Sequence, residues 1–221
     1  MPLAEPPNGA GALASCASQT LAGRTVFRLW RSVGLDGTAR PSPWWFASVP
    51  DNPTAGGRFD LPSPMGTCYV ATSAVGAVLE GLQAHLTSLP VEELRSRRLA
   101  RVNAPDGAPV AARLTSRRLA GAHGVTAALW SGGNRLLTQR WAGAFRRDGW
   151  WALYGGAQHD PSGRLRSYAV FDHPGGHSPT AGGAWTHEST TPADDVALHQ
   201  ELVTFGITVR AAGDLPFTTP P

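Results

Sequence analysis

The sequence predicts a single domain of the α+β class, in which small mixed or antiparallel sheets are flanked by helices. Its 221 residues, 42% of them hydrophobic, are enough to bury one substantial core. Strand-like and helix-like stretches follow one another without a repeat, and no strand–helix–strand rhythm indicates a doubly wound parallel sheet. We expect the domain to span residues 24–210, between a flexible N-terminal arm at 1–23 and a tail at 211–221.

The first half of the domain contains two predicted strands and a helix. The segment TVFRLWRS, residues 25–32, alternates apolar and polar side chains, which is typical of a strand. A loop rich in Pro, Gly and Trp follows at 41–57. The β-branched and aromatic run TCYVAT, residues 67–72, predicts a second strand. Apolar residues at helical spacing over 73–88 then predict an amphipathic helix that Pro90 ends.

The second half of the domain is predicted from the same two periodicities. We expect a helix at 134–147, because Leu137, Trp141 and Phe145 recur on one side and Gly149 follows. The remaining predictions are strands at 99–104, 150–154, 167–172 and 207–210, helices at 114–122 and 194–204, and a loop at 173–190.

Composition and charge exclude several classes of partner. All 19 basic residues are arginine, which together with abundant Ala, Gly and Pro is typical of a GC-rich coding sequence. The formal net charge is only +3 and the arginines are dispersed, so we expect no direct nucleic-acid partner. The sequence has no leader-like segment and no apolar stretch that could span a bilayer, which predicts a cytoplasmic protein without a membrane partner. Cys16 and Cys68 are expected to stay unpaired, as in a reducing compartment.

Common catalytic motifs are absent from the sequence. It contains no phosphate-binding glycine-rich loop and no nucleophile elbow. His173 and His177 lie in a Gly-Pro-rich loop without a third ligand nearby, so we predict no metal site.

One block, residues 56–80, carries residues suited to chemistry. Gly56 and Gly57 let the backbone approach a ligand closely, and Arg58 can grip a diphosphate with two hydrogen bonds. Tyr69 falls in the second strand, and Glu80 falls at the edge of the apolar face of the helix, where its carboxylate is partly desolvated. Composition and spacing alone favour a plainer interpretation, with Arg58 as a surface-loop arginine, Tyr69 as a core aromatic residue and Glu80 as a helix-surface glutamate.

Three stretches of the chain resemble the RES domain family. In VFRLWR, Arg28 matches the early arginine of the family, and in GGRFDLP, Arg58 matches its double-glycine motif. In TCYVATSAVGAVLE, Tyr69 and Glu80 match the strand tyrosine and the helix glutamate. The resemblance is specific over residues 25–86 and can be traced to about residue 172.

The resemblance implies a fold similar to ADP-ribosyltransferases and a toxin that degrades NAD⁺, acting as a glycohydrolase or phosphorylase. NAD⁺ would be the substrate, so no metal or further cofactor is needed. Glu80 would stabilise the oxocarbenium-like ribose, Arg58 and Arg28 would neutralise the diphosphate, and Tyr69 would stack on nicotinamide or ribose. Gln139 and His159 would add polar contacts. An Xre-like antitoxin and a second copy of the chain are the protein partners that the resemblance suggests.

One departure from the family keeps alternatives open. Many members carry a serine where this chain reads YGGAQHD, with Gly155, Gly156 and Ala157. Thr138 is a candidate replacement hydroxyl; the alternatives are a shifted alignment or a degenerate domain that binds a nucleotide or a partner without turnover. ADP-ribosyl transfer to a protein or small acceptor would use the same site. The loop at 44–46, Trp-Trp-Phe, either packs on the sheet or docks an antitoxin or a second protomer.

Overall fold

The computed structural model of the chain describes residues 3–34, 37–82, 87–160 and 162–211. The α+β class predicted from the sequence is confirmed, although one large sheet replaces the small sheets expected. Eight described strands form a mixed sheet in the order β1-β6-β7-β8-β3-β2-β5-β9, in which only β6 and β7 run parallel. The strands are β1 (Ser18–Thr20), β2 (Thr25–Trp30), β3 (Gly66–Ala71), β5 (Arg98–Asn103), β6 (Val110–Arg113), β7 (Ala152–Gly156), β8 (Arg166–Asp172) and β9 (Thr186–Thr190).

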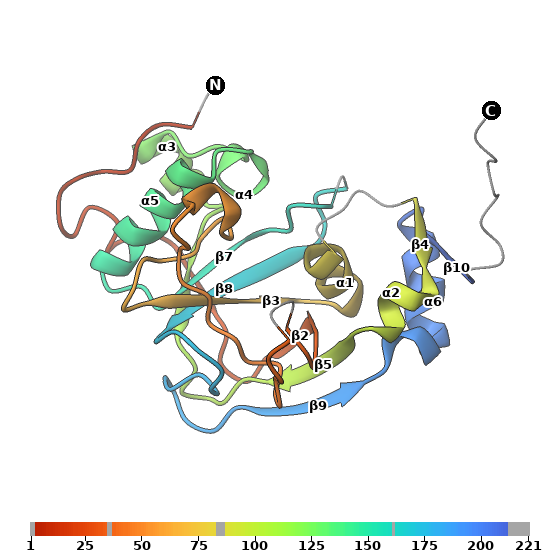
Figure 1. Cartoon of the computed structure of the whole chain (residues 1–221). Coiled ribbons are helices and arrows are strands. Elements are labelled where there is room, and N and C mark those ends of the chain that lie inside the picture. The colour runs from red at the N-terminus through yellow and green to blue at the C-terminus, as the bar shows by residue number, and fades with distance from the viewer. Residues whose placement is uncertain (1–2, 35–36, 83–86, 161, 212–221) are drawn as a thin grey trace.

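The helices form three groups around this sheet (Figure 1). One group lies beside β7, one helix lies over β2 and β3, and a third group lies beyond β5 together with a two-stranded parallel sheet. In this order the groups are α3 (Arg117–His123), α4 (Ala128–Ser131) and α5 (Arg135–Arg147); α1 (Ala74–Leu82); and α2 (Val91–Arg95) and α6 (Val196–Thr204) with β4 (Ser88–Pro90) and β10 (Thr208–Arg210).

Alternation along the central strands divides the core between the two faces of the sheet. On β8, Ala169 and Phe171 pack under the α3–α5 group, whereas Tyr168 and Val170 face the opposite side. Loops cover that opposite face, and the predicted 41–57 loop contributes Trp44 and Phe46, which are 2% and 1% exposed. The packing interpretation of the Trp-Trp-Phe loop therefore holds for those two residues.

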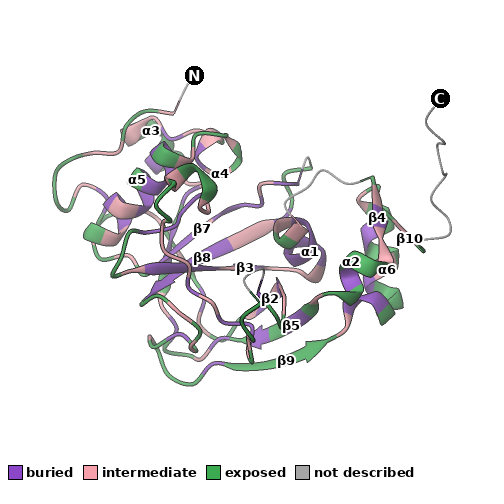
Figure 2. Cartoon of the chain, in the orientation of Figure 1, coloured by how far each residue is buried: buried purple, intermediate pink, exposed green. Residues whose placement is uncertain are grey.

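Most long elements occur where their periodicity predicts them, and the differences concern short or polar segments. The predicted helix at 73–88 is α1 over 74–82; residues 83–86 lie outside the described part, and 88–90 form β4. The predicted loop at 173–190 contains β9, an edge strand whose five residues are all exposed (Figure 2). The sequence did not predict β1, β4, β6, α2 or α4.

The expectation of a flexible N-terminal arm is wrong for the described residues 3–23. Leu13 and Leu21 are fully buried, and β1 pairs with β6. The carboxylate of Asp148, at the end of α5, accepts hydrogen bonds from the backbone N–H groups of Gly11 and Leu13 at 2.9 and 2.7 Å. This segment therefore belongs to the domain, and of the predicted tail at 211–221 only Ala211 lies within the described residues.

Candidate active site

A cavity lies between α1 and the α3–α5 group, over the middle strands of the sheet. Six of the nine residues predicted for the site line it, namely Arg28, Gly57, Arg58, Tyr69, Glu80 and His159. Phe27, Leu153 and Ala169 supply apolar walls, and the sequence reasoning missed the polar lining residues Trp130, Arg135, Gln158 and Ser167. Gly56, Thr138 and Gln139 are not part of the lining.

The cavity exists because β2 separates from β3. β2 pairs with β5 along all six residues but meets β3 at one pair, Phe27 with Ala71. The guanidinium of Arg28 bridges the opening, because its Nη1 donates to the carbonyl of Tyr69 at 3.1 Å and contacts the Sγ of Cys68. Its Nη2 donates to the carbonyl of Trp45 at 3.4 Å. Arg28 thus satisfies backbone oxygen atoms that a paired strand would otherwise satisfy.

Tyr69 and Asp60 hold the turn that carries Arg58. The Tyr69 hydroxyl donates to Asp60 Oδ1 at 2.9 Å and accepts from the backbone N–H of Phe59 at 2.8 Å. Asp60 Oδ2 accepts from the backbone N–H of Gly57 at 2.6 Å. Burial, followed by the nearby Asp60, raises the pKa of Tyr69 well above its ordinary value, so the phenol remains a donor. Asp60 is 3% exposed, and its role was not evident from the sequence.

Glycine is required at position 57 by close packing. A Cβ atom there would lie 2.5 Å from Asp60 Oδ1 and 2.6 Å from the Tyr69 hydroxyl oxygen, both below any ordinary contact distance. The sequence predicted that this glycine pair lets the backbone approach a ligand; in the structure the groups that lie close to Gly57 are the side chains of Asp60 and Tyr69.

Thr138 and Gln139, both on α5, lie behind the turn. Thr138 is fully buried and donates to the carbonyl of Arg58 at 2.7 Å. Gln139 donates from Nε2 to the carbonyls of Gly57 and Pro53 at 3.0 and 2.9 Å. These two side chains position the turn rather than contact the cavity, so the expected direct substrate contacts are not borne out by their placement.

Arg58 is a buried cation, 4% exposed. Its Nη1 donates to the carbonyl of Gly132, whereas Nη2 has no hydrogen-bond partner among the described residues. Burial, followed by the neighbouring charge of Arg135, lowers the pKa of Arg58 to about 10. A buried cation with an unsatisfied N–H is costly unless a ligand completes it, so the site is suited to an anionic group.

Glu80 supplies the opposing charge in the cavity. Its Oε1 accepts hydrogen bonds from the backbone N–H groups of Gln158 at 2.5 Å and His159 at 3.3 Å. Burial raises the pKa of Glu80, and these bonds, with the charges of Arg58 and Arg135, partly oppose the rise. The backbone after β7 therefore fixes the direction of the carboxylate.

Arg135, in the first turn of α5, is a further cation of the site. It lines the cavity and its charge acts on the pKa values of Arg58, Asp60, Tyr69 and Glu80. Its position beside Asn134, which caps α5 through a 3.0 Å hydrogen bond to the N–H of Leu137, was the available sequence signal.

A serine at Gly156, the last residue of β7, would be crowded by Trp130. A Cβ atom at Gly156 would lie 2.5 Å from Nε1 and 2.6 Å from Cδ1 of Trp130, so the indole fills the space of that side chain. Ser167, which pairs with Gly155 in the β7–β8 ladder, lines the same cavity and brings a hydroxyl group there from the neighbouring strand. Thr138, the candidate replacement, does not reach the cavity.

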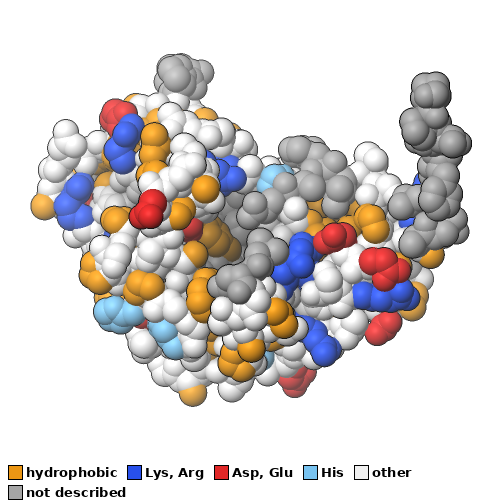
Figure 3. Space-filling view, in the orientation of Figure 1, with side chains coloured by type: hydrophobic (Ala, Val, Ile, Leu, Met, Phe, Trp, Pro, Cys, Tyr) orange, Lys and Arg blue, Asp and Glu red, His pale blue; other side chains and the backbone are white. Residues whose placement is uncertain are grey.

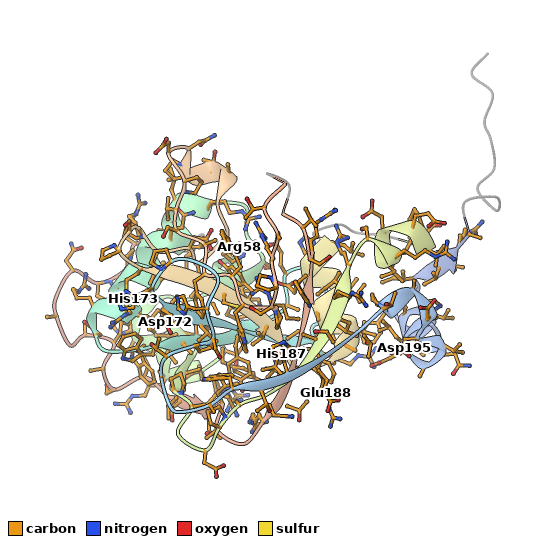
Figure 4. All side chains as sticks on the ribbon, turned by 60° about the horizontal axis from the view of Figure 1, so that its bottom comes forward. Arg58, Asp172, His173, His187, Glu188 and Asp195 are labelled. Carbon is orange, nitrogen blue, oxygen red and sulfur yellow. The ribbon has the colours of Figure 1, made fainter. Side chains whose placement is uncertain are left out.

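The two loop histidines lie apart from this site. Among the described residues no three His, Cys, Asp or Glu side chains are grouped as metal ligands. His173 and Asp172 lie away from Arg58 in Figure 4, and His177 contacts the carbonyl oxygens of His173 and Ser178 at 2.9 Å each. Cys16 and Cys68 are both free. No described helix is long and apolar enough to cross a membrane.

Comparison with known proteins gives one family and one structural likeness. The sequence profile described as "RES domain" matches residues 28–190. A chain from the "Crystal structure of the M.tuberculosis MbcT-MbcA toxin-antitoxin complex" is similar in fold, with a TM-score of 0.52 and 19% identity. The match covers 87% of this chain and 97% of that chain. No curated protein sequence matches the chain.

Proposed function

Because the chain belongs to the RES domain family, we propose that it cleaves the nicotinamide–ribose bond of NAD⁺ and acts as the toxin of a toxin–antitoxin pair. The observation that carries the proposal is the cavity in which Glu80 faces the cations Arg58 and Arg135. A site that cleaves NAD⁺ needs both cationic and anionic side chains, because the diphosphate is anionic and the reacting ribose becomes cationic.

The carboxylate of Glu80 stabilises the ribose as nicotinamide departs. Cleavage of the bond develops positive charge on the ribose ring, as in glycoside hydrolysis. A carboxylate that two backbone N–H groups hold in place needs no reorganisation to meet this charge. The same carboxylate can accept hydrogen bonds from the ribose hydroxyl groups, which fixes the ring.

The arginines bind the diphosphate, and the apolar wall accepts the nicotinamide ring. The unpartnered Nη2 of Arg58 and the guanidinium of Arg135 are donors for phosphate oxygens. The ring of Tyr69 lines the cavity beside Leu153 and Ala169 and offers an apolar surface. The Tyr69 hydroxyl is already bound to Asp60, so Tyr69 acts through its ring and by holding the Arg58 turn.

Release of nicotinamide from NAD⁺ by the purified chain tests the proposal. We expect Glu80→Gln to lower the rate by about two to three orders of magnitude, as for loss of a main electrostatic contact. Glu92→Gln, on an exposed glutamate of α2, is the matched control and should retain the wild-type rate. No release by the wild type, or equal release by both variants, contradicts the proposal.

The products separate the possible acceptors of the ADP-ribosyl group. Free ADP-ribose indicates water, a phosphorylated ADP-ribose indicates inorganic phosphate, and a mass increase on a protein indicates transfer. Mass spectrometry of the same reaction distinguishes the three. If the protein is a toxin, expression of the wild type should arrest bacterial growth and expression of Glu80→Gln should not. If it has an antitoxin partner, co-expression of that partner should restore growth.

A further inference from the structure

A second pocket, which we call the arginine pocket, adjoins the cavity at the Trp30 end of β2. It shares Arg28, Leu29 and Gly81 with the cavity. Its other charged or aromatic lining residues are Trp30, Arg31, Arg40, Trp45 and Arg97. The space-filling view shows a hollow between the α3–α5 group and the α2–α6 group, with arginine side chains at its rim (Figure 3).

From this arrangement we propose that the arginine pocket binds the adenosine monophosphate half of NAD⁺ while the nicotinamide mononucleotide half occupies the cavity, so that Arg28 lies between the two phosphates. The identity of the dinucleotide rests on the proposed function. The affinity of the arginine pocket for a purine nucleotide such as ADP does not rest on the proposed function.

The charge of the arginine pocket calls for an anion. Glu93 contacts Arg97 at 3.1 Å and Arg31 at 3.9 Å, so one carboxylate is shared between two arginines. Arg28 and Arg40 form no ion pair within the described part of the chain. Four guanidinium groups thus line the pocket, and the described residues around it provide one carboxylate, so a phosphate group of the ligand would supply the missing negative charge.

Unsatisfied donors point to a ligand that accepts hydrogen bonds. The Nε atoms of Arg28 and Arg40 and the Nε1 of Trp30 are buried and have no hydrogen-bond partner among the described residues. Buried N–H groups are nearly always paired in folded proteins. Phosphate oxygens, ribose hydroxyls and purine nitrogens are acceptors that a nucleotide would bring to these three donors.

Aromatic surfaces in the same pocket favour a nucleotide over a bare phosphate. The guanidinium carbon of Arg40 lies 4.3 Å from the ring centroid of Trp45, a stacked cation–π arrangement. This contact keeps the guanidinium plane in place, and nucleobases stack on such planes and on aromatic rings. Arg28, which lines both pockets, lies where the diphosphate would pass from one pocket to the other.

Kinetics with two substrates test the proposal. Nicotinamide mononucleotide has the scissile bond but lacks the adenosine half, so it should not depend on the arginine pocket. We expect Arg40→Ala to raise KM for NAD⁺ about tenfold, as for one lost charge-assisted hydrogen bond, and to leave KM for nicotinamide mononucleotide unchanged. Arg31→Ala, in which a partly exposed side chain is removed, should act in the same direction without disturbing Trp45. Arg113→Ala, at an exposed position of β6, is the control and should change neither KM.

Calorimetric titration with ADP separates this proposal from the proposed function. ADP should bind the wild type and Arg113→Ala with the same affinity. Its dissociation constant for Arg40→Ala and for Arg31→Ala should be at least about tenfold higher. If ADP behaves so while no nicotinamide is released from NAD⁺, the arginine pocket stands and the proposed activity fails. If the wild type does not bind ADP, or if Arg40→Ala and Arg31→Ala leave both ADP binding and KM for NAD⁺ unchanged, the inference is overturned.

Discussion

The carboxylate of Glu80, on α1, accepts a 2.5 Å hydrogen bond from the backbone N–H of Gln158, which follows β7. This bond joins α1 to the segment that follows β7, and both residues line the cavity. Its direction is set by backbone, so a substitution at position 158 preserves it and a substitution at position 80 removes it.

The raised pKa of Glu80 predicts an acidic limb in the pH profile. The proposed mechanism needs the ionised carboxylate, and burial raises its pKa. Protonation therefore begins at a higher pH than for an ordinary glutamate, and activity is lost as the pH falls through the raised value. The profile of kcat/KM against pH measures this limb. A limb at or below the ordinary glutamate pKa, in a protein that stays folded there, would contradict the assignment.

Replacement of Gly57 by alanine should damage both the turn and the activity. The new Cβ would collide with Asp60 Oδ1 and the Tyr69 hydroxyl, and we expect a loss of about 1–3 kcal/mol in the free energy of unfolding. Gly143→Ala is the matched control, because a Cβ there meets nothing within 4 Å and alanine favours the helix by about 1 kcal/mol. Urea denaturation compares the two; equal effects of both substitutions would rule out the crowding argument.

Tyr69→Phe tests whether the tyrosine acts through its ring or its hydroxyl group. The variant leaves the buried N–H of Phe59 and Asp60 Oδ1 without their shared partner, which should cost about 1–3 kcal/mol of stability. Because the ring remains, we expect kcat to fall by less than in Glu80→Gln. Tyr154→Phe is the matched control, because the Tyr154 hydroxyl forms no hydrogen bond within the described part of the chain. Its melting temperature should differ little from that of the wild type. Complete inactivity of a folded Tyr69→Phe would assign the chemistry to the hydroxyl group.

A serine at position 156 should destabilise the protein, and this added cost should depend on the presence of the Trp130 side chain. The serine Cβ would overlap the indole, so Gly156→Ser alone should lose about 1–3 kcal/mol. In combination with Trp130→Ala, the additional cost of the serine should largely disappear. A double-mutant cycle measured by denaturation gives this coupling. Additive effects of the two substitutions would show that the indole does not exclude the side chain.

Local periodicity was sufficient for the elements that bury one face. The alternation in β2 and the helical spacing in α5 predicted these two elements, and a β-branched and aromatic run predicted β3. β9 was missed because all five of its residues are exposed and carry no alternation. The N-terminal segment was misjudged because its order depends on Asp148, more than 130 residues away, and composition cannot reveal such a contact.

Site residues that belong to a sequence motif could be predicted. Site residues that only tertiary contacts bring to the cavity could not. Arg58, Tyr69 and Glu80 fall in one block and line one cavity. Arg135 and Ser167 join them only because α5 and β8 fold against that block. Thr138 and Gln139 lie beside the site in sequence but point at the backbone of the turn, so proximity to a motif did not establish contact.

Between β2 and β3, which pair at one position only, the opening beside the cavity is spanned by a side chain rather than by backbone hydrogen bonds. In an ordinary sheet the spacing of neighbouring strands is fixed by a ladder of backbone bonds, which no single substitution can retune. Here one side chain, that of Arg28, spans the opening and sets its width. A substitution at this one position would therefore change the contacts across the opening without removing a backbone hydrogen bond from any strand pairing.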